Sequence, residues 1–393
     1  MDIIHANVLS GGVLLEDYGV RCEGGRIVSL APMARFVPSG ARVLDAGGQI
    51  ACAGYIDQHT HGAAGYDAMD ATQEAMDAIS RHHLATGVTS FLPTTMTAAP
   101  DETAHMLSFL SQYEPPVPVE ITGVHMEGPF LSHGNRGAHP ERLLTLPDAA
   151  WRTLIGRFGR LVRLITVSPE LPGMPAFIRW CVSRGIVVSG GHDEGYDEAI
   201  LPAIDAGMRS VTHIFCCTSG ITRSGSPRKR LGLTEIGLLD DRLYAEAIAD
   251  GNGVPHALLP LLFRAKGRDR VIFVSDSMRA TGLMPGRYRL GGAEDGVDVD
   301  VTADAAILHG QPLYAGSIAP VSQMVADAVQ KSGIPLTDAL LAATKNPAAL
   351  LRLNDRGDIA PGYRDAINLL STDGTLACTV VSGRIFEKGV EKT

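Results

Sequence analysis

The chain has 393 residues, of which 45% are hydrophobic and 20% are charged, with a formal net charge of −9. This composition is that of a globular protein with a sizeable core, and it excludes a disordered or fibrous chain. The scattered charges form no basic stripe and no apolar run approaches the length of a bilayer span, so we expect neither nucleic acid nor a membrane as a partner.

Both ends of the chain are predicted to form short strands separated by glycine turns. The N-terminal strands are expected at 2–9, 13–22, 26–30 and 42–49, and the C-terminal strands at 366–370, 377–381 and 384–387. Neither end is large enough to bury much surface alone, so pairing the two solves the problem for both. We therefore predict a small β-sandwich domain from residues 1–53 plus 360–393.

The middle of the chain, residues 54–359, alternates short apolar runs with helical stretches. Eight such runs are expected as strands, at 55–58, 89–94, 121–126, 161–167, 186–189, 210–215, 243–249 and 271–275. Eight alternating units favour an α/β fold of the (β/α)₈ TIM-barrel type over an open doubly wound sheet, whose glycine-rich phosphate turn is absent. A hairpin is expected between Arg287 and Ser317.

Ligand-type side chains recur where these strands end. They are His59, His61, Glu127, His192, His213 and Asp276. Barrel enzymes carry their catalytic groups at the C-terminal ends of the strands, so we expect these six side chains to meet at the mouth of the barrel.

The pair His59 and His61 has a spacing that points both imidazoles to one side of an extended strand. By itself this pair leaves a metal role and an ordinary hydrogen-bonded role equally open, but the other strand-end residues favour a metal. Imidazoles with a carboxylate suit a divalent ion, with Zn²⁺ preferred, at one or two per subunit. Such an ion lowers the pKa of a coordinated water to about 7. Asp276 is then the expected general base and Glu127 the expected central ligand.

Other nucleophile schemes fit less well, because no GxSxG motif is present and Cys216 and Cys217 lack an obvious base. Those two cysteines are expected as small buried apolar residues. Five histidines are assigned to ordinary core or surface roles: His82, His83, His105, His256 and His309. Without a CxxC spacing or a secretory signal, the six cysteines are expected as reduced thiols of a cytoplasmic protein.

At this point the motifs match a known family. They are AGYIDQHTHG at 53–62, GVHMEGPF at 123–130, RGAHP at 136–140, TVSPE at 166–170, SGGHDEGYDE at 189–198, VTHIF at 211–215, AIADG at 247–251, VSDSMRATG at 274–282, YAGS at 314–317 and ATKNPA at 343–348. Over nearly its whole length the chain resembles the N-acetylglucosamine-6-phosphate deacetylases of the amidohydrolase superfamily.

The resemblance implies a barrel with a terminal β-sandwich, a homodimer, and hydrolysis of an N-acetylated amino sugar phosphate to acetate and the amine. By position, Glu127, His192 and His213 match the principal metal ligands, and His59 and His61 match a pair that some deacetylases use for a second metal. Asp276 matches the catalytic acid/base, and His139 matches a histidine that orients the acyl group. Ser317 falls in a matching segment and is assigned to the substrate site.

Two segments depart from the family pattern where its members bind sugar and phosphate. Cys216 and Cys217 stand where the family has an Asn-Ala-Met run, which makes them candidate substrate contacts, and Gly253 replaces a histidine. The altered loop also holds the basic residues 223 and 228–230. Arg223 or Arg228 is a candidate ligand for an anionic substrate group, either in its own subunit or across a subunit interface. The equally open alternative is that both arginines belong to an exposed, solvated loop.

Three rival functions remain open in the sequence. The first keeps the chemistry but acts on an unphosphorylated or differently substituted N-acyl amino sugar or another small amide. The second is cyclic amide opening or deamination, which the absence of a lysine placed like a carbamylated bridging ligand disfavours. The third is a non-catalytic scaffold, which the retention of all six ligand-type residues disfavours.

Overall fold

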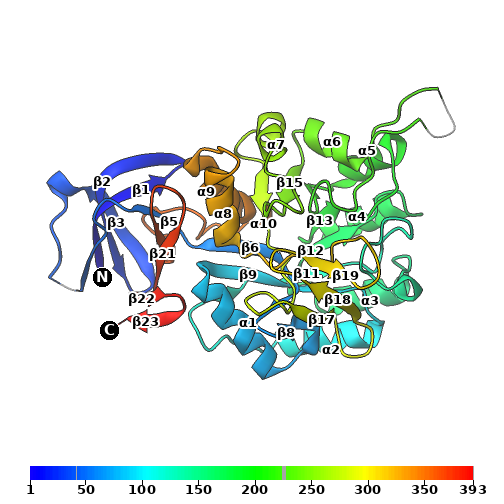
Figure 1. Ribbon diagram of the computed structural model, residues 1–393, viewed down its shortest axis with the longest axis horizontal. Helices are drawn as coiled ribbons and strands as arrows, with labels where there is room; N and C mark the ends of the chain where they lie inside the picture. The colour runs from blue at the N-terminus through cyan, green and yellow to red at the C-terminus, as the bar shows by residue number, and fades with distance from the viewer. Residues whose placement is uncertain (41, 224–226, 393) are drawn as a thin grey trace.

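The computed structural model describes residues 1–40, 42–223 and 227–392. Residues from both ends of the chain form one nine-stranded sheet (Figure 1), in the order β23-β22-β21-β20-β5-β1-β2-β3, with β4 paired to β1. Its strands are β1 (Asp2–Ser10), β2 (Val13–Glu23), β3 (Arg26–Pro32), β4 (Val43–Asp45), β5 (Ile50–Ala53), β20 (Ile367–Leu370), β21 (Leu376–Val381), β22 (Arg384–Glu387) and β23 (Val390–Lys392). The two ends meet where β5 pairs antiparallel with β20. The predicted β domain built from both termini is therefore confirmed, while its boundaries at 53 and 360 stay a prediction.

The barrel consists of eight parallel strands surrounded by helices, as the alternating pattern predicted. The strands are β6 (Tyr55–Thr60), β9 (Val88–Thr95), β11 (Val124–Glu127), β12 (Val162–Val167), β13 (Val187–Gly190), β14 (Ser210–Val211), β15 (Tyr244–Ala247) and β16 (Val271–Phe273), and the short β10 (Glu120–Ile121) also pairs with β9. The first and last strands approach each other through a parallel bridge between Thr60 and Ser277. This closing contact lies beside the ends that carry His59 and Asp276.

Ten α-helices are assigned in the described residues. They are α1 (Gln73–Ala85), α2 (Pro100–Leu110), α3 (Ala149–Arg157), α4 (Met174–Val182), α5 (Asp197–Ala206), α6 (Leu233–Leu239), α7 (Leu259–Lys266), α8 (Val321–Gln330), α9 (Leu336–Ala343) and α10 (Lys345–Leu351), with short 3₁₀ turns at Met33–Arg35, Ala68–Asp70 and Glu141–Leu143. Within the described parts of the chain, no helix is long and apolar enough to cross a bilayer.

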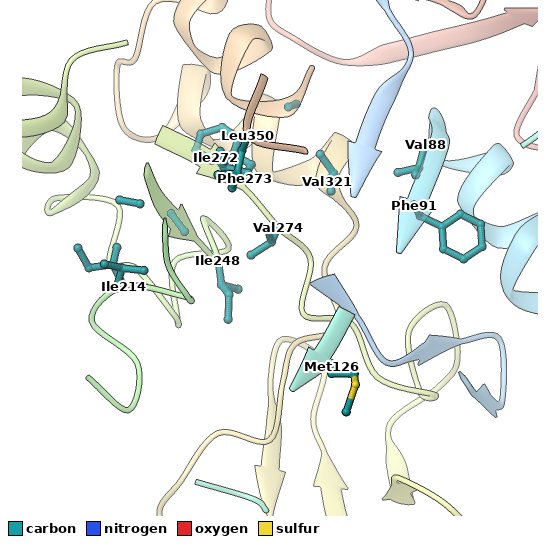
Figure 2. Close-up of a cluster of buried hydrophobic side chains, with 14 of the residues drawn as sticks. Val88, Phe91, Met126, Ile214, Ile248, Ile272, Phe273, Val274, Val321 and Leu350 are labelled. Carbon is teal, nitrogen blue, oxygen red and sulfur yellow. The ribbon is translucent and has the colours of Figure 1, made fainter. Parts of the chain in front are cut away.

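The core runs continuously from the barrel strands to the outer helices (Figure 2), because buried parallel strands present apolar side chains on both faces. Phe273 of β16 and Leu350 of α10 belong to one cluster of buried side chains, together with Val321 of α8. This packing holds the strand ends at fixed positions, which is what a site built from several strands requires.

Several sequence-based expectations differ from the structure in detail. The strand expected at 42–49 is shorter, since β4 ends at Asp45, and the strand expected at 243–249 ends at Ala247. The strand expected at 121–126 is interrupted at Gly123, whose φ of 149° puts it in a conformation that favours glycine. The strand expected at 210–215 ends at Val211, before His213 enters the left-handed region with φ of 30°. The hairpin expected at 287–317 is a three-stranded sheet, since β17 (Gly286–Leu290) and β18 (Val297–Val301) are joined by β19 (Ala306–Leu308). The remaining short strands, β7 (Gly62–Ala63) and β8 (Tyr66–Asp67), form a separate pair.

Candidate active site

The six ligand-type residues expected at strand ends lie together at one end of the barrel. His59 belongs to β6 and Glu127 is the last residue of β11, while the others follow within three residues of the ends of β6, β13, β14 and β16. All six are buried: His59, His61, Glu127, His192, His213 and Asp276. A cluster of buried titratable side chains at the C-terminal ends of barrel strands is the arrangement of a catalytic site.

Glu127 occupies the centre of this cluster, and each of its carboxylate oxygens faces imidazole nitrogens. Its Oε1 atom lies 3.1 Å from Nε2 of His192 and 3.0 Å from Nε2 of His213. Its Oε2 atom lies 3.0 Å from Nε2 of His61 and 3.4 Å from Nε2 of His59. One carboxylate therefore joins two groups of histidines, as a ligand shared between two positions would.

The hydrogen bonds of His192 and His213 show which of their nitrogens are available to a cation. Nδ1 of His192 lies 2.9 Å from the carbonyl oxygen of Asn135, and Nδ1 of His213 lies 3.1 Å from that of Cys216. Because a carbonyl oxygen only accepts hydrogen bonds, both Nδ1 atoms carry a proton, and in the neutral form of each ring the lone pair is therefore on Nε2. These two Nε2 atoms are only 3.1 Å apart and face Oε1 of Glu127. Three electron-pair donors directed at one point suit a divalent metal ion.

A second group is formed by His59, His61 and Asp276. The Oδ1 atom of Asp276 lies 3.3 Å from Nε2 of His59 and 3.3 Å from Nε2 of His61, and neither ring nitrogen of His59 has a hydrogen-bond partner. Burial opposes a charge on His59, but Glu127 and Asp276 outweigh it and hold the pKa of His59 well above its ordinary value. The donor set therefore also fits a second cation beside the first.

His139 differs from these ligands in its tautomer. Its Nδ1 accepts a hydrogen bond from the backbone N–H of Thr97 at 3.2 Å, so the proton of the neutral ring is on Nε2, which lies 3.3 Å from Oε2 of Glu127. Burial lowers the pKa of His139 to about 4, which keeps the ring neutral near pH 7. His139 therefore brings a hydrogen-bond donor to the site rather than a lone pair.

Three of the site residues have strained backbones: φ is 50° at His192, 30° at His213 and 46° at Asp276. Non-glycine residues adopt this left-handed region only when the surrounding structure holds them there, and such residues concentrate at functional sites. Two backbone hydrogen bonds hold Asp276 in this conformation. Its N–H donates to the carbonyl of His59 at 2.8 Å, and its carbonyl accepts from the N–H of Ser317 at 2.7 Å.

Gly316 allows this close approach to Asp276, and its replacement is expected to destabilise the protein. Gly316 has φ of 67°, and an added Cβ would lie 2.6 Å from the carbonyl oxygen of Asp276. We expect Gly316→Ala to lower the free energy of unfolding by about 2 to 4 kcal/mol, measured by urea denaturation. Gly310→Ala is the matched control, because φ there is 74° with nothing within 4 Å of the added atom. Equal losses in the two variants would contradict the contact argument.

A cavity opens beside the cluster. Its lining includes His61, Glu127, His139, His192, His213, Cys216, Cys217, Asp250, Asn252, Asp276, Leu290, Tyr314 and Ser317. Cys216 and Cys217 therefore line the cavity. Both are partly exposed, so the expectation that they are buried apolar residues was wrong. The hydroxyl of Ser317 donates a hydrogen bond to the carbonyl of Ser275 at 2.6 Å, which holds the chain segment next to Asp276 in place.

The structure does not bring Arg223 and Arg228 to this cavity. Arg228 lies 3.3 Å from the carboxylate of Asp197, and neither arginine is part of the cavity lining. Residues 224–226 of the same loop lie outside the described residues. Among the described lining residues the cavity has no lysine or arginine, so this lining offers an anionic substrate group no permanently charged side-chain cation.

Two buried residues that extend the site were not singled out from the sequence. His125 stands two residues before Glu127 in β11, and its Nε2 lies 2.8 Å from the hydroxyl of Thr166 in β12. Glu246 of β15 accepts a hydrogen bond from Gln58 at 2.7 Å, and its other oxygen lies 3.7 Å from Nδ1 of His59. The available signals were the two-residue spacing of His125 from Glu127 and an acidic residue inside an apolar strand.

Comparison with known proteins gives consistent matches along the chain. The model of the amidohydrolase family matches residues 50–386. The human N-acetylglucosamine-6-phosphate deacetylase is 34% identical over 411 residues, which cover 98% of this chain and 95% of the human protein. The N-acetylgalactosamine-6-phosphate deacetylase of Escherichia coli is 31% identical over 363 residues, covering 91% of this chain and 92% of that protein. A mutant N-acetyl-D-glucosamine-6-phosphate deacetylase from Mycobacterium smegmatis, solved in complex with N-acetyl-D-glucosamine-6-phosphate, has a TM-score of 0.87 at 30% identity and covers 100% of this chain and 98% of its own.

Proposed function

We infer the function of this chain from its membership: it belongs to the amidohydrolase family and, within that family, to the N-acetylglucosamine-6-phosphate deacetylases. It is an amide-hydrolysing deacetylase that converts an N-acetylated amino sugar phosphate to the free amine and acetate. The observation that carries this function is the convergence of Nε2 of His192, Nε2 of His213 and the Glu127 carboxylate beside a cavity that Asp276 and His139 also line. A site of this kind hydrolyses an amide by activating water next to the carbonyl.

Glu127, His192 and His213 would hold the principal metal ion, and His59 and His61 would contribute to a second. When bound, a divalent ion supplies a Lewis acid and acidifies the attacking water. We propose Zn²⁺ for this role, because imidazole and carboxylate ligands with Nε2 donors suit it. The number of ions per subunit, one or two, is settled by metal analysis of the purified protein.

Asp276 supplies the proton transfers, and His139 orients the acyl group of the substrate. Asp276, whose Oδ1 faces His59 and His61, takes the proton from the attacking water and delivers it to the leaving amine nitrogen as the C–N bond breaks. His59 and His61 counteract the effect of burial, so the pKa of Asp276 is below its ordinary value and the carboxylate is ionised, as a base must be. His139 donates a hydrogen bond from its Nε2–H to the acyl oxygen, which gains negative charge in the transition state.

Removal of the His139 donor is expected to lower kcat more than it changes KM. We expect His139→Ala to reduce kcat about 10²- to 10³-fold, the usual cost of losing one donor to a developing oxyanion, with the metal content unchanged. Steady-state kinetics with metal analysis measures this. His133→Ala is the control, since His133 lies six residues earlier on the surface and contacts Glu141. A loss of metal in His139→Ala would assign the residue to the ligand set instead.

The decisive test of the function is acetate release from N-acetylglucosamine-6-phosphate by the purified chain. We expect turnover that is lost after treatment with a chelator and recovered on adding Zn²⁺. Turnover that persists in the fully demetallated protein would overturn the metal-dependent function. A screen of N-acetylated sugars and sugar phosphates then ranks substrates by kcat/KM.

A second candidate substrate is the galacto epimer, N-acetylgalactosamine-6-phosphate, because a relative of that name is 31% identical over most of both chains. Unphosphorylated N-acyl amino sugars are a further alternative, since the described cavity lining has no lysine or arginine. Comparing kcat/KM for the two phosphorylated epimers and for free N-acetylglucosamine distinguishes the three.

A phosphorylated substrate needs a cation for its phosphate, and the described part of the cavity lining has no lysine or arginine to supply it. We propose that Arg223 or Arg228 supplies it across the interface of a homodimer, and that the enzyme acts in the cytoplasm. Replacing each arginine with alanine is expected to raise KM for the phosphorylated sugar and to leave KM for the free sugar unchanged. An unchanged KM for both sugars would leave these arginines as parts of a solvated loop.

A further inference from the structure

Asp193, the residue directly after His192, is a fully buried carboxylate that the deacetylation chemistry does not use. Its side chain is 0% exposed. Its Oδ1 accepts a hydrogen bond from the N–H of Ser219 at 2.9 Å, and its Oδ2 accepts from the hydroxyl of Ser219 at 2.6 Å and from the N–H of Gly195 at 3.0 Å. Three donors from two loops therefore converge on one carboxylate.

The partner of Asp193, Ser219, stands at the base of the loop that follows His213. The hydroxyl oxygen of Ser219 accepts a hydrogen bond from the N–H of Leu233 at 2.8 Å, and its carbonyl accepts from the N–H of Thr234 at 3.0 Å. The chain thus leaves Ser219 and returns to it at the start of α6. Asp193 is bound to the closed base of this loop, independently of the basic segment beyond it.

Backbone bonds continue the connection from Asp193 to both imidazoles. The N–H of Asp193 donates to the carbonyl of Cys217 at 3.2 Å, and the neighbouring carbonyl, of Cys216, accepts from Nδ1 of His213 at 3.1 Å. On the other side Asp193 is joined directly to His192. The ring orientations of His192 and His213 therefore depend on two loops that meet at Asp193.

These loops need support, because their backbones are strained where the imidazoles are attached. The φ angles of His192, His213 and Cys217 are 50°, 30° and 48°. Each left-handed residue costs on the order of 1 to 3 kcal/mol and persists only where neighbouring contacts hold it. The hydrogen bonds of Asp193 supply such contacts at the point where the two strained segments meet.

We propose that Asp193 is a positioning residue that couples the loops of His192 and His213, fixes the separation of their Nε2 atoms, and so sets the affinity of the site for its metal ion. This inference rests on the proposed metal-dependent function. Residues that orient metal ligands typically change metal affinity about 10- to 100-fold when they are replaced.

Asp193→Asn tests this inference with almost no change in size. The amide group must place its NH₂ either toward the N–H of Ser219 or toward the N–H of Gly195, so a donor faces a donor in both orientations. The matched control is Asp365→Asn, which replaces another buried carboxylate that accepts a backbone N–H, from Ser382 at 3.0 Å, outside the cavity lining. Ser219→Ala is a second variant that removes one bond to Asp193 and the bond from Leu233.

The readouts are the Kd for Zn²⁺, from competition with a chromogenic chelator, and the visible absorption spectrum of the Co²⁺-substituted protein, neither of which requires turnover. We expect Asp193→Asn to weaken Zn²⁺ binding about 10- to 100-fold and to alter the Co²⁺ spectrum, with Ser219→Ala shifting both in the same direction. Asp365→Asn is expected to match the wild type in both, whatever its effect on stability.

A wild-type Kd for Zn²⁺ and a wild-type Co²⁺ spectrum in Asp193→Asn would overturn the inference. An equal weakening of Zn²⁺ binding in Asp365→Asn would also overturn it, because the effect would then be one of general destabilisation. Should Asp193→Asn not fold, Ser219→Ala decides: weaker metal binding supports the inference and wild-type binding overturns it. A wild-type protein that binds no metal would instead refute the proposed function, so the two failures are distinguishable.

Discussion

Replacing Glu127 with alanine is expected to abolish metal binding and to lower kcat/KM by a factor of at least about 10³. The oxygens of Glu127 face both groups of imidazoles, at 3.0 Å from His213 and 3.0 Å from His61. The negative charge of Glu127 offsets the charge of a metal ion bound among buried imidazoles. The alanine variant lacks this charge. A metal ion contributes several kcal/mol of transition-state stabilisation to such hydrolyses, and each 1.36 kcal/mol is a factor of ten in rate.

Metal analysis and acetate-release kinetics of Glu127→Ala measure this effect together. Glu141→Ala is the control, because Glu141 is an exposed carboxylate that contacts His133 and Arg136. We expect the control to retain metal and activity. A Glu127→Ala protein with a full complement of metal would show that Glu127 is not a ligand, whatever its activity.

Replacing Asp276 with asparagine is expected to lower kcat about 10³-fold while the principal metal ion is retained. General acid–base catalysis by one side chain contributes typically 10²- to 10⁴-fold, and asparagine keeps the shape of the residue but cannot carry the proton. The ligands Glu127, His192 and His213 form their own group without Asp276, so the ion between them needs no contact from it. KM is expected to change little, because the effect falls on the transition state.

The comparison of kinetics with metal content separates two roles for Asp276. Asp304→Asn is the control, since Asp304 is an exposed residue of the segment before β19 whose side chain contacts Thr302. Complete loss of metal in Asp276→Asn would make Asp276 an essential ligand. Wild-type kcat with the metal in place would remove it from the proton transfer.

The barrel was predictable because its strands are continuous apolar runs and its helices fill the spaces between them. Val271, Ile272 and Phe273 are fully buried in β16, as an apolar run in a parallel sheet should be. The third strand of the small sheet near the mouth, at Ala306–Leu308, was not predicted, because three residues between turns carry too little periodicity to be recognised.

The positions of the site residues along the chain were also predictable, but the bonds that orient them were not. His59, Glu127 and Asp276 stand at recognisable strand ends, and barrel topology gathers such ends at one face. Asp193 gave no comparable signal, because an isolated acidic residue in a sequence is more often exposed than buried, and Glu246 gave only the weaker signal of an acidic residue inside an apolar strand. Their roles depend on partners such as Ser219, 26 residues away, and Gln58, 188 residues away.

The sequence by itself determined the fold class, the union of the two termini in one β domain, and the set of strand-end side chains that meet at one end of the barrel. These follow from local apolar patterns and from which residue types end each strand. Only the tertiary structure decided the proton positions on His139, His192 and His213, the left-handed backbone at His213 and Asp276, and the absence of Arg223 and Arg228 from the described cavity lining. The physical reason is that a lone pair or a strained φ is set by hydrogen-bond partners distant in the chain, and only the folded chain brings them together.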